Sequence, residues 1–128
     1  MDYRLEVVAL PVSDVDAAIA FYRDGLGFHL DHDVETVPGI RVVQCTPPGS
    51  PTSIAFGTGM ALGEPGTTRG LQLVVRDIEA AREELAGRGV DVGEVRQLGP
   101  EGMDGSRFLF FSDPDGNGWS VQELRRDG

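Results

Sequence analysis

The chain has 128 residues, of which 40% are hydrophobic and 25% charged, as expected for one globular domain with its own core. Its formal net charge of −10 argues against nucleic acid or an anionic membrane as a partner, because both would repel it. Cys45 is the only cysteine, which excludes an internal disulfide, and we recognise neither a signal peptide nor a membrane-spanning run, so we expect a cytoplasmic protein.

The first half of the chain predicts one strand, one helix and three further strands. Apolar residues on both faces predict a strand over Leu5–Val12. Ser13 or Asp14 suits the cap of a helix that ends at Gly25 or Gly27, because apolar residues recur at helical spacing in between. The strands that follow are expected at Phe28–Val34, Arg41–Thr46 and Ser53–Phe56.

The second half repeats this pattern. Gly70–Ala81 echoes Val7–Ala18 at an offset of 63 residues, with Asp77 as the helix cap. A strand near Val90–Arg96 and two closing strands complete the repeat. The predicted fold class is therefore α+β, with tandem βαβββ modules that form mixed sheets within one domain, 1–128. We expect module one at about 4–57, a glycine-rich linker at about 58–68 and module two at about 69–124.

The closing strands flank the most distinctive motif of the chain, Ser112-Asp113-Pro114-Asp115-Gly116-Asn117-Gly118-Trp119. Its Pro-Asp-Gly run predicts a hairpin turn, with the two aspartates as turn residues rather than an acid–base pair. The motif, placed after the repeat, resembles the closing hairpin of the vicinal oxygen chelate superfamily. That superfamily holds glyoxalase I, extradiol dioxygenases, and fosfomycin- and bleomycin-resistance proteins. The resemblance implies sheets curved around a central concave pocket, and a homodimer.

The resemblance also implies where a metal would bind. In metal-binding members, His and Glu ligands come from the first strand of each module and from the last strand of the second. The corresponding positions here are Val7, Gly70 and Ser120. Valine and glycine side chains offer no lone pair and a neutral serine is a weak ligand, so we expect no metal and no other cofactor. In this respect the chain resembles the bleomycin-resistance branch, whose cavity binds a ligand without chemistry.

The same three positions outline a ligand pocket. If they point inward, strand alternation adds residues two positions away, and the resemblance adds two phenylalanines from the hairpin. The further lining residues expected are Gln72, Gln122, Phe108 and Phe110, together with Leu5, Ala9 and Val74. Such a lining suits a neutral apolar or aromatic small molecule, oriented by the amides and the hydroxyl. Each of these residues could instead pack in the core, as Trp119 is expected to do on the helix side.

The two histidines are predicted to face opposite sides of a strand, because they stand three residues apart. His29 belongs to a carboxylate-rich face and is expected to be solvated. His32 stands among apolar neighbours, where a satisfied core or interface histidine, a ligand contact and a general base all remain open.

Three functions are compatible with these observations. The first is a glyoxalase/bleomycin-resistance-like protein that binds a small organic ligand without metal, for antibiotic sequestration or ligand carriage. The alternative is a superfamily enzyme, such as a lyase, isomerase or dioxygenase-like member, with atypical ligands or metal-free acid–base catalysis by His32. The third is a structural or regulatory protein with a vestigial pocket. Whether the protein is an enzyme stays open at this stage.

Overall fold

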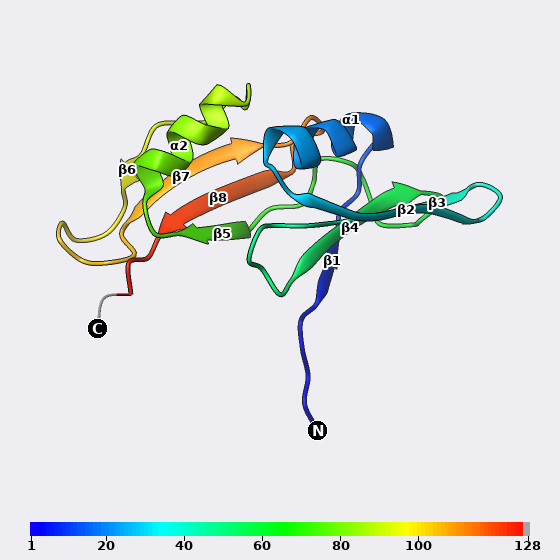
Figure 1. Ribbon diagram of the computed structural model, residues 1–128, viewed down its shortest axis with the longest axis horizontal. Helices are drawn as coiled ribbons and strands as arrows, with labels where there is room; N and C mark the ends of the chain where they lie inside the picture. Colours follow the sequence, from blue (N-terminus) through cyan, green and yellow to red (C-terminus); the bar gives the residue numbers. More distant parts are fainter. Residues whose placement is uncertain (127–128) are drawn as a thin grey trace.

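The computed structural model describes residues 1–126 of the chain. Each half of the chain forms one four-stranded mixed sheet, and the helices cover the same side of both sheets (Figure 1). The first half contains β1 (Val7–Ala9), α1 (Val15–Ile19), the π-helical segment η1 (Ala20–Gly25), β2 (His29–Val37), β3 (Ile40–Thr46) and β4 (Ser53–Thr58). The second contains β5 (Leu71–Val75), α2 (Ile78–Gly87), β6 (Arg96–Gln97), β7 (Arg107–Ser112) and β8 (Gly118–Glu123).

The two sheets have the same topology, which confirms the α+β fold class. Their strand orders are β1-β4-β3-β2 and β5-β8-β7-β6, with the first and last strands of each half paired in parallel. The helices also begin alike, because the side chain of Asp14 accepts from the Ala17 amide and that of Asp77 from the Ala80 amide. β7 and β8 form the predicted antiparallel hairpin.

Several predicted boundaries were wrong. The first strand covers only Val7–Ala9 instead of Leu5–Val12, and β2 extends beyond Val34 to Val37. The strand predicted near Val90–Arg96 is reduced to the two residues of β6. Residues 90–95 have strand propensity but do not form a continuous ladder with β7, so most of the predicted strand is not formed.

The core lies between the helices and the sheets. Leu109, Phe111, Trp119 and Val121 alternate with exposed or half-buried residues along β7 and β8, and all four are buried. The ring of Trp119 stacks on Phe111 at a centroid distance of 6.1 Å, which confirms its predicted place on the helix side.

The Pro-Asp-Gly turn does more than reverse the chain, because it connects the two halves. Asp113 is 5% exposed, and its carboxylate accepts from the Tyr22 hydroxyl at 2.7 Å and from the Asn117 amide at 2.8 Å. The Tyr22 hydroxyl in turn accepts from the Trp119 indole at 3.0 Å, and Asn117 donates to the Pro11 carbonyl. Burial and the adjacent carboxylate raise the pKa of Tyr22, which keeps its hydroxyl protonated as a donor. Asp113 is therefore a turn residue that also fastens the first half to the second.

The prediction that His29 and His32 face opposite sides was wrong. A register shift lies between Leu30 and His32, so that His29 is opposite Thr46 and His32 is opposite Gln44. Thr46 and Gln44 are two residues apart on β3, which continues in regular register with β4, so they share a face. The extra residue of this β-bulge, Asp31, brings both histidines to the same face.

Candidate ligand-binding face

The second sheet has one face turned away from α2, here called the open face. Its positions alternate with the buried residues of β7 and β8, and the strand register sets them in two rows. The first row consists of Gln72, Ser120 and Phe110, and the second of Val74, Gln122, Phe108 and Arg96. Five residues predicted to bind ligand, Gln72, Phe108, Phe110, Ser120 and Gln122, therefore share one surface.

The polar side chains of the open face form a continuous hydrogen-bonded ladder. The Ser120 hydroxyl donates to Gln72 Oε1 at 3.2 Å, and Gln72 Nε2 donates to Gln122 Oε1 at 2.8 Å. Gln122 Nε2 then donates to the Gly105 carbonyl at 2.8 Å. The ladder fixes the orientation of both amides, and each keeps donor or acceptor capacity for a ligand. It contains no group that could act as a general acid or base near neutral pH.

The aromatic side chains of the open face form an apolar surface beside this ladder. The Phe108 and Phe110 rings lie at a centroid distance of 6.4 Å with an interplanar angle of 12°. Phe110 remains 43% exposed and Val74 45% exposed. Large apolar groups left accessible next to fixed polar groups are typical of a surface that binds another molecule.

Two hollows border the open face. One of about 330 Å³ is lined by Gly70, Phe110 and Ser120, with Arg69 and Trp119 among its other walls. The other, of about 480 Å³, lies between the Pro47–Pro51 loop and β5, where Gln72 and Val74 line it. Gly70 has a φ of +88°, a conformation that favours glycine, and an added side chain would extend into open space. Glycine at this position therefore permits the backbone conformation and leaves the hollow unfilled.

Two predicted site residues lie on the first sheet instead. Val7 is on β1 and is 46% exposed, and His32 is exposed on β2. Near His32, the Asp31 carboxylate accepts from the Thr46 hydroxyl, from His29 Nδ1 at 2.8 Å and from the Gln44 amide at 3.0 Å. The Thr46 and His29 hydrogen bonds lower the pKa of Asp31 to about 2.

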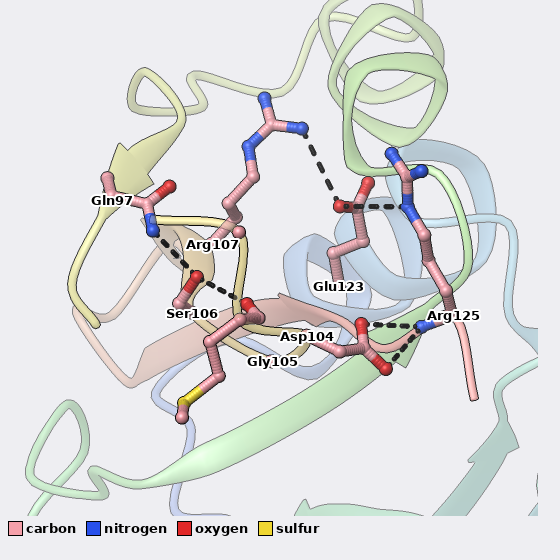
Figure 2. Close-up of a pocket in the computed structure, with 9 residues that line it drawn as sticks. Gln97, Asp104, Gly105, Ser106, Arg107, Glu123 and Arg125 are labelled. Atoms are coloured by element: carbon pink, nitrogen blue, oxygen red, sulfur yellow. Dashed lines mark hydrogen bonds and ion pairs between the residues drawn. The ribbon is translucent and has the colours of Figure 1, made fainter. Parts of the chain in front are cut away.

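A third hollow, which the sequence reasoning missed, lies on the helix side of the second sheet (Figure 2). It measures about 410 Å³ and surrounds Glu123, which is 5% exposed. Glu123 accepts from the Ile78 amide at the start of α2 at 2.9 Å, and Arg107 and Arg125 each lie 3.5 Å from its other oxygen. Through the Ile78 amide, Glu123 stabilises the N-terminus of α2 next to its cap Asp77, and the two arginines hold the carboxylate in place; its position in an alternating strand gave no signal of that role.

Within residues 1–126, no three His, Cys, Asp or Glu side chains come close enough together to hold an ion. Gly70 and Ser120 share a hollow, whereas Val7 lies on the other sheet. In the same range, none of the helices has the length and apolar character required to cross a membrane.

Comparisons with known proteins agree with this architecture. The family model of the Glyoxalase/Bleomycin resistance protein/Dioxygenase superfamily matches residues 4–121. The chain belongs to this superfamily. It is similar to TnmS3, an antibiotic binding protein from Streptomyces sp. CB03234, with 35% identity, a TM-score of 0.79, and 96% of this chain and 97% of that chain covered.

Two further structures of superfamily proteins are similar over nearly the whole chain. A glyoxalase/bleomycin resistance protein from Streptomyces sp. CB03234 has 36% identity and a TM-score of 0.75, with 94% of this chain and 100% of that chain covered. A superfamily member from Sphaerobacter thermophilus DSM 20745 has 33% identity and a TM-score of 0.79, with 95% and 98% covered. No curated protein matched the chain.

Proposed function

We propose that this superfamily member is a metal-independent binding protein for a small apolar or aromatic organic molecule, in the sense of antibiotic sequestration or ligand carriage. The observation that carries this proposal is the open face, where accessible Phe110 and Val74 lie beside the ordered ladder of Ser120, Gln72 and Gln122. The rings supply apolar contact area, and the amides supply fixed polar contacts that orient a ligand.

The composition of the open face supports binding over catalysis. Its polar groups are two amides, one hydroxyl and one guanidinium, so a ligand held there meets no activated nucleophile and no neutral-pH base. His32, the best candidate base for the enzymatic alternative, belongs to the first sheet. The similarity to the antibiotic binding protein TnmS3 supports the same choice.

A homodimer is part of this proposal. Both sheets leave apolar side chains exposed, among them Val7 at 46%, Val34 at 44% and Phe110 at 43%. A second copy that covers these faces would enclose the hollows, bury the ligand more completely and remove apolar surface from water. Light scattering at micromolar concentration tests this part, and a strictly monomeric protein would contradict it.

Cys45, buried and reduced, agrees with the cytoplasmic location that we infer.

A thermal-shift screen of aromatic antibiotics and metabolites against EDTA-treated protein tests the proposed function. A ligand that binds the native state raises the melting temperature, and the increase should persist in chelator. Phe110→Ser should abolish most of the shift. Met103→Ser, which also removes an exposed apolar side chain (60% exposed) but from the hollow around Glu123 on the helix side, should leave it unchanged. Equal shifts in both variants would contradict the proposed site.

A further inference from the structure

The charge of the open face differs from that of the whole protein. The chain contains 21 acidic residues and 11 basic residues, yet no Asp or Glu occupies an open-face position on β5, β6, β7 or β8. The charged residue in its two rows is Arg96. A ligand on this face is therefore close to positive charge, although the protein as a whole attracts cations.

Arg96 stands directly beside the aromatic surface. It is opposite Phe108 across the β6–β7 pair, so its side chain lies on the same face, about 5 Å away at the usual strand spacing. Its side chain is exposed, and within residues 1–126 no hydrogen bond or ion pair joins that side chain to another residue. Its guanidinium is thus available at the end of the row formed with Phe108 and Gln122.

A second arginine lies at the other end of the aromatic pair. Arg69 lines the hollow that Phe110 and Ser120 also line. Its Nη1 donates to the carbonyls of Gly66 at 2.6 Å, of Thr68 at 2.9 Å and of Gly116 at 2.9 Å. These neutral acceptors hold the guanidinium in place and leave its charge uncompensated.

Within residues 1–126, no carboxylate forms an ion pair with Arg96 or Arg69. Glu94, two residues before Arg96, lines a hollow on the helix side together with Arg82. Asp31 on the first sheet already accepts hydrogen bonds from three side chains. The positive charge next to the phenylalanines is therefore not neutralised by an acidic neighbour on the same surface.

We propose that the ligand of this protein is a planar aromatic acid, whose ring packs on Phe108 and Phe110 and whose acidic group lies toward Arg96. This inference rests on the proposed binding function and specifies the class of ligand. Guanidinium binds carboxylate, phenolate or sulfonate oxygens through directed, charge-assisted hydrogen bonds, and the two phenylalanines offer ring contacts to an aromatic frame. The arginines would offset the repulsion that the net charge of −10 imposes on any anion.

Two fluorescent probes with nearly the same aromatic frame test the inference. Anilinonaphthalenesulfonate carries an anionic group, and N-phenylnaphthylamine is its neutral counterpart. Wild-type protein should bind the sulfonate more tightly, and Arg96→Gln should weaken sulfonate binding about two- to fivefold, the range for a solvent-accessible ion pair. The same variant should leave the affinity for the neutral probe unchanged. Added salt should weaken only the sulfonate complex.

Arg23→Gln is the matched control, because it removes the same charge from an exposed position on η1. It should change neither affinity. Arg69 is left intact because its guanidinium holds the loop before β5. If the neutral probe binds in a Phe110-dependent manner but the sulfonate binds no better, or if Arg96→Gln affects both probes equally, the inference is wrong and the proposed function stands. If neither probe binds, both are wrong.

Discussion

Tyr22→Phe removes one oxygen atom from the connection between the two halves of the chain. The hydroxyl is buried, donates to Asp113 at 2.7 Å and accepts from the Trp119 indole at 3.0 Å. Its loss deletes a hydrogen bond to a carboxylate, for which mutational series give about 1.5–3 kcal/mol. It also leaves the buried indole N–H without its acceptor, at a cost of about 1–3 kcal/mol.

Asp113 keeps three other donors, the Asn117 side chain and the backbone amides of Asp115 and Asn117, which limits the damage. We therefore expect Tyr22→Phe to lower the free energy of unfolding by about 3 kcal/mol, a sum of contributions near the lower ends of the two ranges. Chemical denaturation followed by far-UV circular dichroism measures this loss. Tyr3→Phe, at a residue that is 89% exposed, is the control and should change stability by less than about 0.5 kcal/mol. If the two variants are equally stable, the turn does not connect the halves as described.

Three further predictions concern single side chains. Trp119→Ala should lower the free energy of unfolding by about 3–5 kcal/mol in denaturant melts, because a large buried ring is removed, and a loss well under 1 kcal/mol would show that the ring is not in the core. Burial raises the pKa of Cys45 to about 11, so its thiol should react with Ellman's reagent at pH 8 only after unfolding, and rapid reaction of the native protein would contradict its placement. The pKa of Asp31 is lower in the folded state, so its stabilising contribution should be present above pH 4 and be lost as the pH falls toward 2. Acid titrations of wild type and Asp31→Asn should show a difference in stability that shrinks over that range, whereas a constant difference would refute the assignment.

The sequence predicted best what neighbouring residues determine. Asp14 and Asp77 cap helices because each cap depends on an amide three residues later, and the hairpin follows from the Pro-Asp-Gly turn. Alternation separated Phe108 and Phe110 from Leu109 and Phe111, and the family resemblance assigned the first pair to the ligand side; the structure has that pair on the open face and the second pair buried. The repeat at an offset of 63 residues predicted two similar sheets.

The features that the sequence did not predict depend on long-range packing. The bulge at Asp31 places His29 and His32 on one face, and strict alternation has no means of anticipating an inserted residue. The contacts of Asp113 with Tyr22 join residues 91 positions apart. The charge of the open face likewise depends on Arg96 meeting Phe108 across a two-residue strand that periodicity had extended over 90–96.

Isothermal titration of EDTA-dialysed protein, with its metal content checked by elemental analysis, tests most directly the claim that an organic ligand binds without metal. The titrant is the tightest compound from the thermal-shift screen. We predict one saturable binding event whose affinity is the same before and after chelation, because the Val7, Gly70 and Ser120 positions supply no metal ligands. The affinity should fall at least about fivefold in Phe110→Ser, because this variant removes an aromatic contact of the open face. A stoichiometric divalent ion in the purified protein, or binding that EDTA abolishes and zinc, nickel or manganese restores, would contradict the claim.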